Sequence, residues 1–319
     1  MSARTTMQTA VQRYLDERRH LGFDLRFSGL SLMSFARYAD AHNHHGPLTL
    51  ALQMGWVQEH VLRTSPLTWA RRLEILRPFA AYYRQFEPES VVPDSLTFGR
   101  GHRRLAPHIY HQKEVVDLLA AASALSPSGG LRPATYQALF GLIASTGLRL
   151  SEALHLQDGD VDLQNNALTV RKTKFSKSRC LPIHPTVTQA LRAYRNFRDG
   201  VVGCETNRPF FVSPAGLALP KRTVHHVFER LRGHLGWVAR GGHPHPRIHD
   251  LRHTFAVRRV QRWHENGTSV EHGMFTLCTY LGHAKISDTY WYLTGTPDLM
   301  GVVGSTFERF AMGQEVGHA

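Results

Sequence analysis

Cysteine is scarce in this sequence, and the cysteines present are not spaced for a disulfide framework or a zinc site. There are three, Cys180, Cys204 and Cys278, an odd number with no Cys-x-x-Cys pair. Long apolar runs are missing too: none approaches the ~18 residues that span a membrane. Residues 1–19 also lack the apolar segment of a signal peptide. We therefore expect a protein without a membrane segment that works in a reducing compartment, the cytoplasm.

Lysine is also scarce, although the chain is strongly basic. The formal net charge is +13 and the isoelectric point is about 10.1. Residues 1–104 carry 14 Arg against 9 acidic residues, a net of +5, and residues 105–319 carry 24 Lys and Arg against 16, a net of +8. Both halves can therefore attract one polyanion, above all nucleic acid, and a single basic tail is excluded.

The few lysines are clustered. Only six of the 38 basic residues are lysines, and three of them, Lys172, Lys174 and Lys177, fall in one short window. Compositional drift is one explanation. The other is that this window needs a group that can give up a proton, which arginine, with a pKa above ~12, does not do.

The first hundred residues have the periodicity of helices, at residues 11–19, 31–41, 51–62 and 69–86, with a kink predicted at Pro78. Residues 87–107 are rich in proline and glycine and carry Arg100, Arg103 and Arg104, which is typical of a linker. We therefore predict a helical, basic domain over residues 1–104, ending in a basic linker, and a second domain over residues 105–319. A basic linker between two basic domains suits a clamp around a duplex.

The second domain combines helical patterns with one short β region. Helices are predicted at residues 112–122, 133–144, 186–197, 223–235, 249–264 and 287–293. The turn residues Gln164-Asn165-Asn166 separate strands at 161–163 and 167–171, and a further strand at 179–183 follows a turn near Phe175. The predicted fold is mainly α with a small three-stranded antiparallel β-sheet, an α+β class.

Four segments of the second domain carry candidate catalytic residues. In STGLRLSEALHL (145–156), Gly147 breaks a helix and places Arg149 at a helix junction, where an ion pair with Glu152 is the alternative interpretation. In KTKFSKSRCLPI (172–183), the lysines lie on a hairpin tip, where they can reach into a groove or simply face solvent. In LGHAKISDTYWYLT (281–294), His283 follows a glycine, and Tyr290 and Tyr292 come seven and nine residues later.

The remaining segment is HDLRHTFA (249–256). His249 and Arg252 are three residues apart on a predicted helix and therefore share a face. His249 and His253 also have the spacing of the zinc-hydrolase motif His-Glu-x-x-His, with His243 and His245 nearby as conceivable third ligands. That motif requires Glu after the first His, and Asp250 is one methylene too short to serve well as its general base, so metal binding is the less favoured interpretation.

Together, these segments resemble the tyrosine recombinase (phage integrase) family, which includes Xer-type recombinases, integrases and transposon-encoded relatives. The family's catalytic residues occur in the order Arg, Lys, His-x-x-Arg, His or Trp, and Tyr. Here TGLRLSE supplies Arg149, HDLRH supplies His249 and Arg252, and LGH supplies His283. The family's Tyr follows that His by nine residues, which selects Tyr292 over Tyr290. Its Lys lies five residues before the Arg of the following strand, which selects Lys174 over Lys172 and Lys177.

The resemblance covers nearly all of residues 107–310 and implies that residues 105–319 form the catalytic domain. Residues 1–104 match only as a helical, basic core-binding (SAM-like) DNA-binding domain of about the right size. The resemblance also implies an activity. Tyr292 would attack double-stranded DNA and form a 3′-phosphotyrosyl bond, with Arg149, Arg252 and His283 stabilising the charge on the phosphate. Lys174 would act as general acid, and His249 would assist proton transfer at the tyrosine. The resemblance implies no cofactor and no metal.

It further implies a homo-tetramer on paired DNA sites, and it leaves open whether a partner recombinase is required and whether the role is integration, transposition or resolution. Three alternatives remain. A topoisomerase-like enzyme would use the same chemistry on one DNA as a monomer. A DNA-binding protein without catalysis and a zinc hydrolase belong to other classes.

Overall fold

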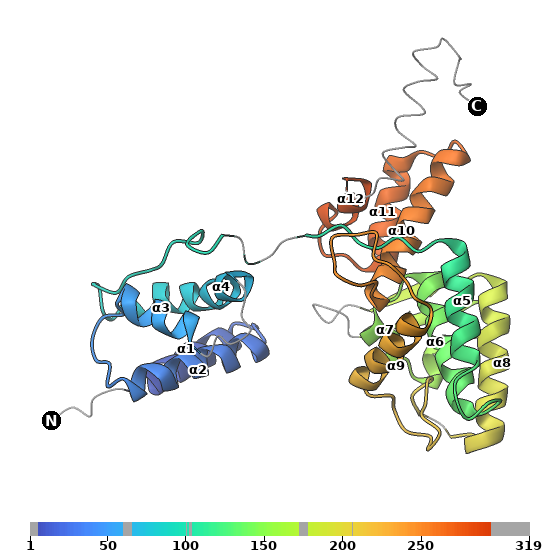
Figure 1. Ribbon diagram of the computed structural model, residues 1–319, viewed down its shortest axis with the longest axis horizontal. Coiled ribbons are helices and arrows are strands. Elements are labelled where there is room, and N and C mark those ends of the chain that lie inside the picture. Colours follow the sequence, from blue (N-terminus) through green and yellow to red (C-terminus); the bar gives the residue numbers. More distant parts are fainter. Residues whose placement is uncertain are drawn as a thin grey trace, which may run out of the picture. The chain divides into compact units, whose positions relative to one another are not determined.

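The computed structural model describes residues 6–59, 66–99, 101, 104–171, 178–205 and 207–294, apart from the side chains of residues 271, 272 and 292–294. The chain divides into two compact units, Met1–Arg104 and Leu105–Ala319 (Figure 1). Each unit has its own buried apolar cluster. In the described part of the chain, no helix is long and apolar enough to cross a membrane.

The described part of the first unit consists of helices α1 (Met7–His20), α2 (Arg26–Ala41), α3 (Leu50–Gln58) and α4 (Pro66–Tyr83). Their core contains an aromatic group, in which the ring of Phe35 lies edge-on to Trp56 and Phe79, with centroids 5.4 Å and 6.2 Å apart. The helix α4 contains Pro78, the position of the predicted kink, in its interior. The helix α2 begins five residues earlier than predicted, because Phe27 and Leu30, 83% and 68% exposed, do not follow the apolar stripe that marks a buried face.

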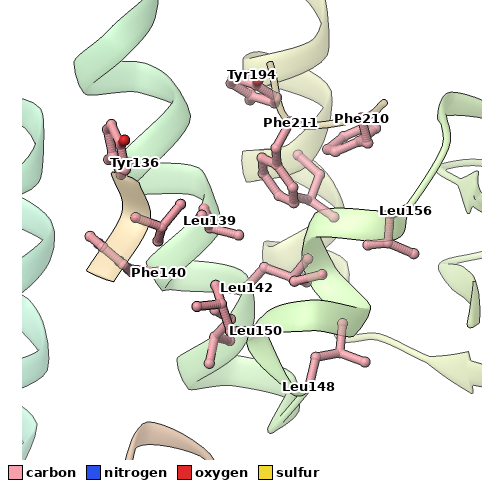
Figure 2. Packing of buried hydrophobic residues seen from close by; sticks show 14 of the residues in the cluster. Tyr136, Leu139, Phe140, Leu142, Leu148, Leu150, Leu156, Tyr194, Phe210 and Phe211 are labelled. Atoms are coloured by element: carbon pink, nitrogen blue, oxygen red, sulfur yellow. The ribbon is translucent and has the colours of Figure 1, made fainter. Parts of the chain in front are cut away.

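The second unit is built around α6 (Leu131–Thr146). Figure 2 shows the buried cluster to which α6 contributes Tyr136, Leu139, Phe140 and Leu142. The ring of Tyr194 stacks on Phe211, with centroids 5.4 Å apart. The other described helices of this unit are α5 (Gln112–Ser123), α7 (Leu150–His155), α8 (Pro185–Val202), α9 (Lys221–His234), α10 (Ile248–Glu265), α11 (Val270–Leu281) and α12 (Ser287–Thr294).

A small sheet accompanies these helices. The strands β1 (Val161–Asp162), β2 (Ala167–Val170) and β3 (Arg179–Pro182) pair antiparallel in the order β1-β2-β3. The register joins Val161 to Leu168 and Leu168 to Leu181, which gives the predicted meander. The predicted class, mainly α with a small antiparallel sheet, is therefore confirmed.

The helix α11 was not predicted, because the sequence there reads only as an apolar segment. It contains Gly273, a weak helix former. A Cβ atom at this position would lie 2.6 Å from the indole of Trp263 on α10, so the glycine allows α10 and α11 to approach closely. The helix ends at Gly282, whose φ of +68° is the left-handed conformation that favours glycine at a helix C-terminus. The residue that follows is His283.

Candidate active site

Arg149 lies in a tight junction between α6 and α7. The helix α6 ends at Gly147 with φ +66°, and a Cβ there would approach the ring of Phe255 to 2.6 Å. Glu152 of α7 accepts hydrogen bonds from the Arg149 backbone N–H (3.0 Å) and from its Nη1 (2.7 Å). The ion pair that the sequence offered as an alternative is present. It orients the guanidinium and leaves the Arg149 side chain about one-third exposed, at 32%.

Arg252 is almost completely buried, with 1% of its surface exposed. Its Nη1 donates to the carbonyl of Gly147 (2.7 Å), and its Nη2 donates to the carbonyl of Leu281 (2.8 Å) and to Nε2 of His283 (2.9 Å). One guanidinium therefore ties the break after α6 to the end of α11. The helices α10, α11 and α12 pack against one another around this point (Figure 1).

Three arginines donate hydrogen bonds to consecutive backbone carbonyls at the end of α11. Arg179 Nε donates to the carbonyl of Tyr280 (2.9 Å) and Arg252 to that of Leu281. Arg149 Nη2 donates to the carbonyl of Gly282 (3.2 Å). The last carbonyls of a helix have no partner within it and carry the negative end of the helix dipole. This helix terminus therefore stabilises several positive charges in a small volume.

His283 joins this centre to α12. Its Nε2 accepts from Arg252, so Nδ1 carries the proton and donates to the hydroxyl of Thr289, 2.7 Å away and fully buried. Burial, together with the charges of Arg252 and Arg149, lowers the pKa of His283 to about 4. The imidazole is therefore neutral at neutral pH while no anion is bound.

His249 lies one helical turn before Arg252 on α10 and is an exposed residue. The protein packed around its imidazole, together with Arg252 and Arg247, lowers its pKa to about 4. Its ring meets His253 edge-on at 4.6 Å, and His253 meets Trp291 of α12 at 5.3 Å. These rings connect α10 to the helix that contains Tyr292. Across the described residues, no three His, Cys, Asp or Glu side chains come together as a metal site would require.

Arg149, Arg252, His249 and His283 thus lie in one region of the second unit, although 134 positions separate the first from the last. The backbone of Tyr292 belongs to α12, but its side chain lies outside the described residues. Lys172, Lys174 and Lys177 lie outside them as well. The sequence analysis gave no functional role to Arg179, Thr289 or Trp291. It considered Glu152 only as an ion-pair partner of Arg149, the alternative to a catalytic role for that arginine.

A family model described as the phage integrase family matches residues 109–297. The chain belongs to this family. The predicted resemblance is confirmed, and the protein is a tyrosine-type recombinase, a DNA strand transferase by class. The match spans every residue of the site above.

Similar proteins agree. The chain is 37% identical to a protein of Sinorhizobium fredii (y4rB) that carries the name of an integrase/recombinase, over 96% of this chain and 98% of that protein. It is 26% identical to the tyrosine recombinase XerC of Bacillus subtilis, over 89% and 85% of the two chains.

Two solved structures share the fold. One is the Tn1549 transposon integrase in complex with transposon right end DNA, with a TM-score of 0.64, 18% identity, and coverage of 95% and 99%. The other is the XerH recombinase bound to its difH substrate after cleavage, with a TM-score of 0.64, 19% identity, and coverage of 94% and 85%.

Proposed function

We propose that this protein cuts and rejoins double-stranded DNA at specific sites with Tyr292 as nucleophile, and that it acts in integration, transposition or resolution. The observation that carries the proposal is the convergence of Arg149, Arg252 and His283 on the turn between α11 and α12. A planar guanidinium binds phosphate oxygens in bidentate fashion, and that of Arg149, about one-third exposed, lies beside the buried positive charge of Arg252, which suits a phosphodiester.

Preorganised positive charge stabilises the charge that develops on a phosphate in the transition state. The guanidinium of Arg252 is held by backbone carbonyls and that of Arg149 by Glu152, so neither has to reorganise during reaction. Arginine charges contribute to the low pKa of His283, and a bound phosphate would offset those charges. We infer that DNA binding raises the pKa of His283, so that its imidazole donates a hydrogen bond to a non-bridging oxygen.

The reaction exchanges one bond for another. The hydroxyl oxygen of Tyr292 attacks phosphorus, the bond from phosphorus to the 5′ oxygen breaks, and Lys174 protonates that oxygen as general acid. His249 assists proton transfer at the tyrosine hydroxyl, and its imidazole is neutral at neutral pH because its pKa is about 4. The phosphodiester energy is kept in the 3′-phosphotyrosyl bond, and a 5′-hydroxyl of a second strand reverses the step. We therefore expect neither a metal nor a nucleotide cofactor to be needed.

The first unit is proposed to bind DNA beside the second, because residues 1–104 carry a net charge of +5. We further propose a homo-tetramer on paired sites, acting in the cytoplasm. The segment 304–319 would help this assembly, because Phe307, Phe310 and Ala311 have the spacing of one helix face; the segment lies outside the described residues.

Mixing the protein with a nicked, labelled suicide substrate and a second DNA tests the function. A recombinase forms a covalent adduct and joins the two DNAs. Adduct formation without joining, together with relaxation of a supercoiled plasmid in a parallel reaction, would favour a topoisomerase-like enzyme. Binding without adduct would exclude catalysis, and loss of cleavage in chelator with recovery in zinc would revive the His-x-x-x-His interpretation.

Deletion from Gly304 onward should reduce cooperative filling of paired sites and leave binding to one site intact.

A further inference from the structure

Arg179, the first residue of β3, uses its whole guanidinium to make contacts beside the candidate active site. Its Nη1 and Nη2 donate to the two carboxylate oxygens of Glu152, at 3.2 Å and 3.0 Å, and its Nε donates to the carbonyl of Tyr280 at 2.9 Å. The side chain is only 11% exposed. A Cβ on Gly282 would lie 2.6 Å from Nη1, so the guanidinium also packs directly on the turn before His283.

Glu152 connects Arg179 to the phosphate-binding group. The same carboxylate that accepts from Arg179 also accepts from the backbone and side chain of Arg149. Burial raises the pKa of Glu152, but the hydrogen bonds from Arg179 and from the Arg149 backbone outweigh it, and the net result is a lowered pKa. Glu152 is therefore an ionised, buried bridge between two arginines.

The position of Arg179 in the sheet adds a second connection. Val170 and Arg179 form the pair of the β2–β3 ladder nearest to the segment that contains Lys172, Lys174 and Lys177. The side chain of Arg171, the residue directly after β2, is bound to the buried Asp160. Of these two arginines, Arg179 is the one that contacts Glu152 and the end of α11.

We infer that Arg179 is a positioning residue. It fixes the start of β3, the strand that follows the lysine-bearing segment in the chain, against Glu152 and the end of α11. Through this strand it would set the general acid relative to the phosphate that Arg149, Arg252 and His283 stabilise. The inference rests on the proposed function, because it takes the general acid to come from that segment. The guanidinium matters for its shape: a single ammonium cannot reach both carboxylate oxygens and the Tyr280 carbonyl together.

The chemistry of the leaving group distinguishes this role from a purely structural one. A 5′-bridging phosphorothiolate leaves as a thiolate, whose pKa is near that of a cysteine thiol, ~8.5, and therefore needs little protonation. A defect in placing the general acid should disappear on this substrate. A defect in stabilising the phosphate should persist, because the non-bridging oxygens are unchanged.

The test is single-turnover cleavage by the full chain of an ordinary suicide substrate and of its sulfur-substituted counterpart. Arg179→Met should cleave ordinary DNA about 10²-fold more slowly than the natural protein, at the lower end of general-acid effects, and the sulfur substrate at nearly the natural rate. Arg179→Lys should show a smaller defect with the same rescue, and it serves in place of Arg179→Met if that variant does not fold. The control Arg171→Met should cleave both substrates nearly normally, and Arg149→Met should be slow on both.

If each variant, Arg179→Met and Arg179→Lys, is slowed as much on the sulfur substrate as on ordinary DNA, the inference is overturned. Arg179 would then act only as a support of Arg149. Normal cleavage of ordinary DNA by both variants would overturn it as well. The proposed function fails separately, if the natural protein forms no adduct with either substrate.

Discussion

Replacement of Arg252 by methionine removes the buried guanidinium and keeps an unbranched side chain in its place. The change deletes the hydrogen bond to Nε2 of His283 and the two hydrogen bonds to the carbonyls of Gly147 and Leu281, which are 2.7 Å and 2.8 Å long. A hydrogen bond that involves a charged group contributes about 1.5–3 kcal/mol. Because the methionine restores some apolar contact, we expect the free energy of unfolding to fall by about 2–4 kcal/mol, less than the sum of the two bonds. A domain of ordinary stability remains folded after such a loss.

The same change should alter the titration of His283. Burial, Arg252 and Arg149, in that order, hold its pKa at about 4, below its ordinary value of 6.5. Without Arg252, burial and Arg149 still act, so the pKa should rise but stay below 6.5. Strand cleavage should fall by ~10²–10³-fold, as when one preorganised donor is lost from a transition-state site. Affinity for DNA should change little, because many other phosphates remain in contact.

The assay is an NMR titration of the imidazole C–H resonances, with His283→Gln to assign the signal, alongside denaturant unfolding and single-turnover cleavage. Arg198→Met is a matched control. Arg198 is also 1% exposed and bonds a backbone carbonyl, that of Phe210, but its other contacts are Asp158 and Asp199 rather than the active site. The control should lose stability without a change in the pKa of His283. If that pKa is the same in Arg252→Met as in the natural protein, the arginine does not act on the histidine as argued.

Three further predictions concern other parts of the molecule. Lys174→Ala should cleave ordinary DNA ~10²–10⁴-fold more slowly and recover on the 5′-phosphorothiolate strand. Lys174→Arg should be slow on ordinary DNA too, because a guanidinium does not readily give up a proton. If Lys172→Ala or Lys177→Ala is rescued instead, that residue is the general acid. The folded-state pKa values of His249 and His283, about 4, lie below 6.5, so the folded state binds fewer protons than the unfolded chain between these values. Stability is therefore complete above about pH 6.5 and falls as the pH drops towards 4, and a flat stability profile over this window in urea titrations would refute the shifts. Removal of residues 1–104 should flatten the dependence of log affinity on log salt, since each neutralised phosphate contributes about −0.9 to the slope, and an unchanged slope would show that these residues make no backbone contacts.

The sequence predicted the parts of the site that depend on local pattern. Gly147 marked the helix break that places Arg149, and the spacing of His249 and Arg252 put them on one helix face, as in α10. Fold class followed from the same patterns, because helical and strand periodicities are short-range properties.

The missed features depend on contacts between distant positions. Arg179 donates a hydrogen bond to the carbonyl of Tyr280, 101 positions away in the chain, and no local sequence pattern predicts that contact. The sequence did not predict α11, because it contains Gly273, a weak helix former. The glycine is needed there for its small size, since Trp263 of α10 packs against it. The sequence offered an ion pair with Glu152 as the alternative to a catalytic Arg149. The structure contains that ion pair, which holds the guanidinium in place and is compatible with the proposed role of Arg149.

The identity of the attacking residue is tested most directly by trapping the covalent intermediate and mapping it. A suicide substrate labelled on the cleaved strand would be reacted with the protein, digested with protease and nuclease, and analysed by mass spectrometry. We predict a nucleotide joined through its 3′ phosphate to Tyr292, absent from Tyr292→Phe and retained in Tyr290→Phe. A label on Tyr290, on any other residue, or joined through a 5′ phosphate would contradict the mechanism proposed for this protein.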